Sequence, residues 1–585
     1  MRSMSTSEPE SDAVNTDGAE TIIRVLSPIL LEAIQIVSDN DPVLDRYYAH
    51  HDGRDFFDMD VFAYHFLPRL REGARNLSQE QRYQFQDLLD FLQTRFGNAW
   101  RKAQILFGEG LVDVSTARYL FAPAHILVRR DKNKQITGVV QASFSEASYE
   151  EDRVTLEGDA HSWSFNGSFF RETISVSVVL KAPRTTTTKI TKLSLYPLEY
   201  AKYETEELLR LRSETFWSCR HYNYVTYNGP NVTEDTDYFD TRFLVDVTAY
   251  LKMHGTDEKS SRANENKRDD LGTNAMASKN PPDHLLYLFP PNIYGFDIME
   301  KKWVNLRVDC ISPIRWNKSA FETLELKPES KMLIRALVSN KIAADRATDM
   351  VSGKGTGLIV LLHGGPGTGK TLTAESVAEI AEKPLYRVTC GDIGIEPREV
   401  EKYLESVFYL GRIWDCVVLL DEADVFLEQR SLEDLARNAL VSVFLRTLEY
   451  YSGILILTSN RVGTFDEAFK SRIQLALHYK NLDQPQRAQI WTNFITRLQD
   501  LNESMDADGI LAKVKDLSEY PMNGRQIRNA ITTARQLALY NDEPLNIGHL
   551  QHSIAVSGEF DKYLIKVKGD VDDDELAKEE GYRVP

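Results

Sequence analysis

A glycine-rich motif at residues 364–371 constrains the fold of this chain more than any other feature of the sequence. An apolar segment of strand length, residues 358–362, precedes the motif, and a helical pattern over residues 371–381 follows it. In such a strand–loop–helix the glycines let backbone N–H groups surround a polyphosphate, and the helix N-terminus adds a favourable dipole. The motif therefore predicts an α/β nucleotide-binding domain. The residues predicted to hold the nucleotide are Gly364, Gly365, Pro366, Gly367, Thr368, Gly369, Lys370, Thr371 and Leu372.

Two acids after a second apolar segment complete the predicted chemistry. Residues 417–420 are apolar and end at Asp421 and Glu422, with Asp421 lying 51 residues after Lys370 (421 − 370). Lys370 is expected to reach the β- and γ-phosphates, and the Thr371 hydroxyl is expected to ligate Mg²⁺ together with Asp421. Glu422 can orient and polarise the attacking water. The pattern therefore predicts Mg²⁺-dependent hydrolysis of a nucleoside triphosphate.

Composition excludes several other classes of protein. The 585 residues carry a net charge of −18, with 69 basic against 87 acidic residues, which argues against a general nucleic-acid binder. No apolar run has the length of about 18 residues that a bilayer span needs. Residues 1–20 resemble neither a secretory signal nor an Arg-rich transit peptide, and the cysteines have no metal-binding spacing. We therefore expect an intracellular soluble protein, cytoplasmic or nuclear, without a membrane span.

The sequence also predicts how the chain is divided. Ser27-Pro28 and the capping box of Ser78 and Gln81 predict helix starts. Asn166-Gly167 predicts a hairpin turn, residues 190–196 and 285–289 are expected to be strands, and strands alternate with helices from about residue 324. The expected regions are an acidic disordered N-terminus (1–20), a helical region (21–109), a β-rich domain (110–253), a flexible insert (254–283), a strand-rich continuation and linker (284–323), the α/β domain (324–483), a helical lid (484–560) and an acidic tail (561–585).

Four segments together resemble one family. Residues 364–371, 420–427, 457–461 and 523–528 are similar to the motifs of AAA+ ATPases, in particular classical-AAA-like fungal proteins with one ATPase module after a long N-terminal region. The resemblance covers about residues 320–555. It implies a P-loop NTPase fold whose parallel sheet precedes a C-terminal helical lid and follows a mixed, β-rich N-terminal region. It also implies ATP and Mg²⁺ as cofactors and a homo-oligomeric ring, a hexamer.

The resemblance also implies roles for three further residues. Asn460, after the predicted strand at residues 453–458, resembles sensor 1, whose amide contacts the γ-phosphate and the lytic water. Arg472 occupies the place of the arginine finger, which acts on a neighbouring subunit, and Arg461 is a rival for that role. Arg525 stands where many family members have sensor 2, whereas Arg528 could instead serve a salt bridge.

Three functional readings stay open at this point. The first is ATP-driven remodelling of a protein partner recruited by the N-terminal region. The second is an ATP-gated scaffold or switch with slow hydrolysis, because residues 389–397 lack the aromatic of a threading pore loop and offer only Ile393 or Ile395. The third is a nucleic-acid-linked ATPase, since aromatics between residues 196 and 227 could stack bases, although such aromatics more often build a core.

Overall fold

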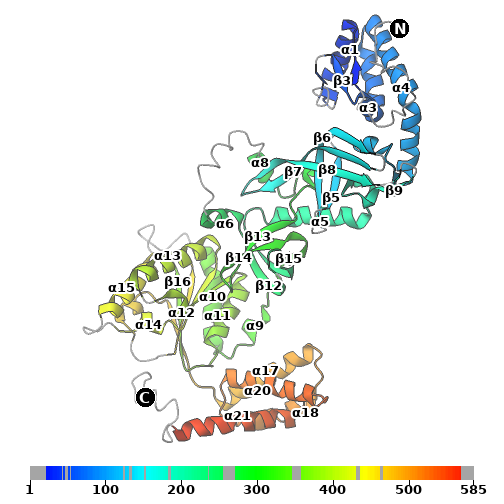
Figure 1. Cartoon of the computed structure of the whole chain (residues 1–585). Helices are drawn as coiled ribbons and strands as arrows, with labels where there is room; N and C mark the ends of the chain where they lie inside the picture. The colour runs from blue at the N-terminus through cyan, green and yellow to red at the C-terminus, as the bar shows by residue number, and fades with distance from the viewer. Residues whose placement is uncertain are drawn as a thin grey trace. The chain divides into compact units, whose positions relative to one another are not determined.

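The computed structural model describes residues 22–567, apart from residues 43, 46–50, 53, 123–124, 131–134, 151–152, 182, 184–185, 235, 255–270, 345–356, 395, 430–434 and 461–464. The chain forms two compact units (Figure 1). The first consists of Met1–Asp297 and Lys302–Pro313, and the second of Ile298–Lys301 and Ile314–Pro585. The predicted acidic N-terminus, most of the predicted flexible insert and most of the predicted acidic tail lie outside the described residues.

The first unit begins with helices and a small sheet. Ser27 caps α1, with the Leu30 N–H 3.4 Å from its Oγ, and the Ser78–Gln81 capping box starts α4, so both predicted helix starts are confirmed. Buried apolar residues at helical spacing join these helices in one core. The elements are β1 (Ile22–Arg24), α1 (Pro28–Asp39), β2 (His51–Asp52), β3 (Asp55–Phe57), α3 (Met59–Gly73) and α4 (Gln79–Gly108).

An antiparallel sheet follows, in the order β10-β5-β6-β7-β8. The predicted Asn166-Gly167 turn joins β7 to β8, and Gly167 has a φ of +96°. The predicted strand at residues 190–196 is wrong as a continuous strand, because the 3-10 turn Ile190–Lys192 interrupts it. The strands are β5 (Ile126–Arg130), β6 (Ile136–Glu150), β7 (Arg153–Phe165), β8 (Phe169–Lys181) and β10 (Leu195–Pro197), and β4 (Leu111–Val112) pairs separately with β9 (Thr188–Lys189).

A second antiparallel sheet has the order β14-β13-β12-β11-β15. The strand predicted at residues 285–289 is wrong: this segment packs its apolar side chains into the core as a turn after the 3-10 element Asp283–Leu285. Tyr196, Phe216, Trp217 and Tyr227 are buried, so these aromatics build cores rather than a base-stacking surface. The elements are α5 (Tyr203–Ser218), β11 (Asn223–Pro230), β12 (Asp237–Val245), α6 (Val247–His254), α8 (Thr273–Met276), β13 (Asn292–Asp297), β14 (Lys302–Arg307) and β15 (Ile311–Pro313).

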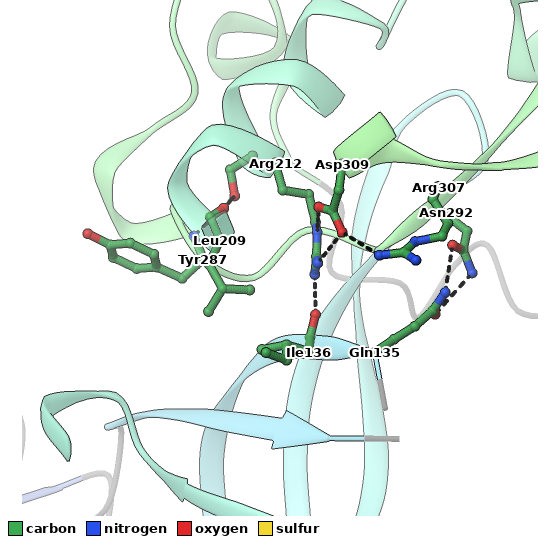
Figure 2. Close-up of polar contacts among 9 residues, drawn as sticks. Gln135, Ile136, Leu209, Arg212, Tyr287, Asn292, Arg307 and Asp309 are labelled. Atoms are coloured by element: carbon green, nitrogen blue, oxygen red, sulfur yellow. Dashed lines mark hydrogen bonds and ion pairs between the residues drawn. The ribbon is translucent and has the colours of Figure 1, made fainter. Parts of the chain in front are cut away.

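A part-buried ion pair joins α5 to the 3-10 turn Val308–Cys310 within the first unit (Figure 2). The Arg212 side chain, 2% exposed, donates from Nε to Asp309 Oδ1 at 2.7 Å and from NH2 to Oδ2 at 2.8 Å. Its NH1 also donates to the carbonyl of Ile136 at the start of β6. Arg307 lies 3.5 Å from the same carboxylate. The paired charges compensate each other's loss of hydration, which is why a buried arginine is tolerated here.

The second unit contains a fully parallel sheet in the order β17-β18-β19-β16-β20, as the alternation of strands and helices predicts. Leu358, Val360 and Leu362 of β16 pack with apolar residues of α10 and α11 in one core. The strands are β16 (Leu358–Gly364), β17 (Leu385–Thr389), β18 (Val417–Asp421), β19 (Ile454–Ser459) and β20 (Leu475–Tyr479). The helices are α9 (Ser319–Glu322), α10 (Pro328–Ala344), α11 (Lys370–Ala381), α12 (Cys390–Ile393), α13 (Pro397–Ile413), α14 (Asp424–Leu427), α15 (Leu435–Glu449) and α16 (Glu467–Lys470).

In the described residues after β20 the named elements are all helices, as predicted for the lid. Trp491, Ile527 and Leu550 are fully buried in a helical core of their own. The helices are α17 (Gln484–Asp500), α18 (Ala507–Ala512), α19 (Val514–Ser518), α20 (Gly524–Tyr540) and α21 (Ile547–Val567). Because the carboxyl ends of parallel strands meet at one edge of a sheet, the polar residues that end β16, β18 and β19 come together.

Candidate nucleotide-binding site

The glycine loop runs from the end of β16 to the start of α11, as the motif predicts. Gly367 has a φ of +73°, and a Cβ there would lie 2.5 Å from the Asn523 side chain. Gly364 has a φ of +148°, and a Cβ there would lie 2.1 Å from the carbonyl oxygen of Tyr479. Only glycine meets both the backbone geometry and the lack of space.

Lys370 lies inside this loop. It is 7% exposed, and its Nζ donates to the carbonyls of Gly364 at 2.9 Å and Gly365 at 2.7 Å. Thr368 Oγ1 donates to the Gly365 carbonyl at 2.8 Å, which braces the loop from within. The loop thus holds an ammonium group at the N-terminus of a helix, and both features attract an anion.

Asp421, the last residue of β18, collects hydroxyl donors from two neighbouring elements. It is 5% exposed. Thr371 Oγ1 lies 3.2 Å from its Oδ1, and Thr458 Oγ1 lies 2.6 Å from the same atom. The structure therefore brings Thr371 and Asp421 together, as the two predicted metal ligands require. Hydroxyl and carboxylate oxygens are the ligands that Mg²⁺ prefers in proteins.

Glu422 follows this buried carboxylate but is itself exposed. Its backbone is in the left-handed region, with a φ of 58°, and its N–H donates to Thr458 Oγ1 at 2.9 Å. A non-glycine residue rarely adopts this conformation without a local cause, and here Thr458 bonds both acids of the pair. Sequence reasoning missed Thr458, although it stands in the motif at residues 457–461.

Asn460 comes directly after β19, as predicted, and is half-buried. Its N–H donates to Asp424 Oδ1 at 3.1 Å, and the hydroxyl of Ser459 donates to the same oxygen. Asp424 therefore fixes the backbone from which the Asn460 side chain projects. Sequence reasoning assigned Asp424 no role, although the residue stands in the motif at residues 420–427.

Arg472 contacts α16 and the end of α15, not the glycine loop or Asp421, among the described residues. Its NH1 donates to the Ala468 carbonyl at 2.9 Å, and its NH2 lies 3.3 Å from Glu449 Oε2 at the end of α15. The side chain is 28% exposed. Its rival Arg461 lies outside the described residues.

The start of α20 contacts the glycine loop. The N–H of Gly524 donates to the Gly367 carbonyl at 3.0 Å, and Asn523 caps the helix through the Gln526 N–H at 2.9 Å. Arg525 and Arg528 are both exposed on the first turns of this helix. The structure thus brings the lid to the loop through Asn523 and Gly524, which sequence reasoning did not identify.

The segment after β17 contains the two isoleucines that could stand in for a pore-loop aromatic. Ile393, the last residue of α12, is 4% exposed and therefore buried, so the idea that it presents an apolar side chain to solvent is wrong for this structure. Ile395 lies outside the described residues.

One histidine beside the loop has a strongly shifted pKa. Burial, followed by the nearby His478 and Lys370, lowers the pKa of His363 to about 4. The two rings stack at a centroid distance of 5.0 Å across β16 and β20. His363 is consequently neutral at pH 7 and adds no charge beside Lys370.

Two protein-family models match the nucleotide-binding domain and the lid of this chain. Residues 360–480 match the family described as "ATPase family associated with various cellular activities (AAA)". Residues 482–571 match the "Fungal AAA+ ATPase lid domain". The chain therefore carries an AAA ATPase domain followed by a fungal-type AAA+ lid, which confirms the resemblance and the predicted fold class.

Curated relatives match a part of the chain. The human "ATPase family AAA domain-containing protein 3B" is 31% identical over 22% of this chain and 21% of its own length. "ATPase family AAA domain-containing protein 3-B" of Xenopus laevis is 33% identical over 28% of this chain and 29% of its own length. The chain thus spans less than a third of the length of these relatives.

A solved structure titled "Crystal structure of FIGL-1 AAA domain in complex with ADP" is 18% identical, with a TM-score of 0.32, over 44% of this chain and 98% of that chain. None of the helices in the described part of this chain combines the length and the apolar sequence needed to cross a membrane.

Proposed function

We propose that this protein binds ATP with Mg²⁺ in the glycine loop and hydrolyses it. The observation that carries the proposal is the carboxylate of Asp421, which accepts from Thr371 and Thr458 directly beside the loop that holds Lys370. A threonine hydroxyl can donate to this carboxylate while its oxygen lone pair remains available to a cation. The donor set therefore fits Mg²⁺, held by Thr371 and Asp421. When bound, the ion neutralises charge on the phosphates.

The remaining residues have separate roles in binding the phosphates, activating the water and sensing the γ-phosphate. Backbone N–H groups of residues 364–372, other than Pro366, and the Lys370 ammonium bind the phosphates. Glu422, exposed next to the metal carboxylate, orients and polarises the water. Asn460, held by Asp424, contacts the γ-phosphate, and Arg525 on the first turn of α20 reports the phosphate state to the lid.

The arginine finger implies an assembly. In its own subunit Arg472 pairs with Glu449 and the Ala468 carbonyl, so it would act on the nucleotide of a neighbouring subunit. We propose a homo-oligomeric ring, with six subunits by family resemblance. ATP turnover that rises steeply with protein concentration would support action in trans, whereas turnover per subunit that is constant on dilution would contradict it. The cytoplasmic or nuclear location stays a prediction.

The output of hydrolysis is proposed to be remodelling of a protein partner that the N-terminal unit recruits. A second candidate, an ATP-gated switch that threads no polypeptide, is favoured by one observation: Ile393 is buried in a segment that has no aromatic residue. A nucleic-acid-linked ATPase has less support, because four of the aromatics that could stack bases, Tyr196, Phe216, Trp217 and Tyr227, lie in cores, which leaves Tyr203 and Tyr222 as the exposed ones. Stimulation of hydrolysis by DNA or RNA at physiological salt would revive that reading.

Two variants test the proposed function. Glu422→Gln should bind ATP as the wild type does and hydrolyse it at a small fraction of the normal rate. Lys370→Ala should lose nucleotide affinity, measured with a fluorescent ATP analogue. Wild-type turnover by Glu422→Gln would remove Glu422 from its role, and undiminished affinity in Lys370→Ala would contradict the phosphate site. The Glu422→Gln protein is also the form in which to search for partners, because it should hold ATP.

A further inference from the structure

The carboxylate of Asp421 has an ionic partner that the glycine loop does not explain. Arg387 of β17 places its NH2 atom 2.6 Å from Asp421 Oδ2. The side chain of Asp421 is 7% exposed. The other partners of this carboxylate, Thr371 and Thr458, are neutral hydroxyl donors. Arg387 is therefore the partner that changes the net charge of the proposed metal site.

The register of the sheet explains how Arg387 reaches this position. Strands β17 and β18 are parallel, with Arg387 beside Leu419 and Thr389 beside Asp421. Tyr386 and Val388 are buried, so by strand alternation Arg387 and Thr389 share the opposite face. Arg387 thus lies two residues before the edge where Asp421 ends its strand. Its side chain is long enough to span that gap.

The contacts of the guanidinium are few. Its Nε is buried and has no hydrogen-bond partner within the described part of the chain, while the side chain as a whole is 40% exposed. Arg387 donates a hydrogen bond from NH2 to the carboxylate of Asp421. A guanidinium held in this way by one carboxylate acts through its charge, because a structural arginine usually satisfies several of its five donors.

A second acidic group, Glu375, also interacts with Arg387. Burial raises the pKa of Glu375 on α11, and Asp421 raises it further, while Arg387 and Arg528 oppose the rise. Arg528 belongs to α20 of the lid. The positive charge of Arg387 therefore acts on two carboxyl groups of the nucleotide-binding domain, those of Asp421 and Glu375.

We propose that Arg387 is the counter-charge of the magnesium site, which holds the Asp421 carboxylate in place and lowers its affinity for a free divalent cation. A nearby positive charge repels the ion and neutralises part of the carboxylate. The site would then take its metal together with the phosphates of the nucleotide, whose own charge compensates for Arg387. This inference deepens the proposed function and rests on it.

Replacement of Arg387 by an uncharged residue tests the inference without any measurement of hydrolysis. We would titrate Mn²⁺, which accepts the same oxygen ligands, into the nucleotide-free full chain and follow free Mn²⁺ by electron paramagnetic resonance, with ADP binding by the wild type measured separately. Arg387→Gln should lower the Mn²⁺ dissociation constant by about five- to tenfold, the effect of one unit charge beside a divalent ion at a partly exposed site. Arg387→Met, which has no polar atom to leave unpaired, should give the same shift and serves if the Gln variant is unstable.

Two controls separate charge from structure. Arg387→Lys keeps the charge and should bind Mn²⁺ within about twofold of the wild type. Arg446→Gln removes another arginine of this unit, paired with Glu401 on α13, and should leave Mn²⁺ binding unchanged. An unchanged or weakened affinity in the neutral Arg387 variants would overturn the inference, as would an equal gain in Arg446→Gln. Failure of the wild type to bind any ADP would instead contradict the proposed function.

Discussion

The contact between the lid and the glycine loop can be tested by adding one methyl group. At Gly367 the backbone has a φ of +73°, and a Cβ would lie 2.5 Å from Asn523 Oδ1. This oxygen accepts the Gln526 N–H at 2.9 Å and so caps α20. Gly367→Ala must therefore strain its own backbone and also displace the cap of the lid helix.

The two costs can be estimated separately. A left-handed alanine costs about 1 kcal/mol, and loss of the Asn523 cap costs about 1 kcal/mol more. Gly367→Ala should thus reduce the free energy of unfolding of the second unit by about 2 kcal/mol. Asn523→Gly alone should cost only a few tenths, because glycine is itself an acceptable N-cap. The double variant should lose about 1.3 kcal/mol, since the clash is gone and the strain remains.

Urea unfolding of the full chain measures these values, and the transition that ADP shifts identifies the second unit. Gly110→Ala is the matched control for backbone strain: its φ is +70°, and a Cβ there meets no atom within 4 Å. It should cost about 1 kcal/mol in the other unit. If the effects of Gly367→Ala and Asn523→Gly simply add in the double variant, the lid cap does not contact the loop in solution and the reasoning fails.

Three further predictions concern other parts of the molecule. Among the described residues, Arg212→Met leaves Asp309 with the more distant Arg307 as its basic partner, and it should lower the unfolding free energy of the first unit by about 3 kcal/mol in urea. A loss below about 0.5 kcal/mol would contradict a stabilising role for the pair. The pKa of His363 is lowered to about 4 in the folded chain, so the imidazole binds a proton more readily when the chain is unfolded. Its contribution to the free energy of unfolding is therefore fully present above pH 6.5 and is lost as the pH falls towards 4. About 1 kcal/mol should be lost by pH 5, after discounting for partial exposure, and a His363→Asn variant should lose less over the same range. Arg472→Ala should lower ATP turnover on the order of 10³-fold, and mixing it with Lys370→Ala subunits should restore part of the activity; no restoration would argue against a finger in trans.

The local sequence alone predicts the parts of this protein that depend on neighbouring residues. The glycine motif at residues 364–371 predicts its own strand, loop and helix, because glycine conformations and helix-capping are short-range effects. The Asp421–Glu422 pair is predicted in the same way, as two acids at the end of an apolar strand. Ser27, Ser78 and Asn166-Gly167 likewise predict the helix starts and the hairpin that the structure contains.

Only the tertiary structure decides which distant residues meet. Arg387 reaches Asp421 because the parallel register aligns β17 with β18, and the uniformly buried residues of β18 have no alternation that would identify the neighbouring strand. Gly524 reaches Gly367 across 157 positions (524 − 367) because the lid packs back on the domain. The segment at residues 285–289 has the apolar composition of a strand, but it forms a turn whose apolar side chains are buried in the core. Short apolar runs are ambiguous in this way because burial rewards the same side chains in either conformation.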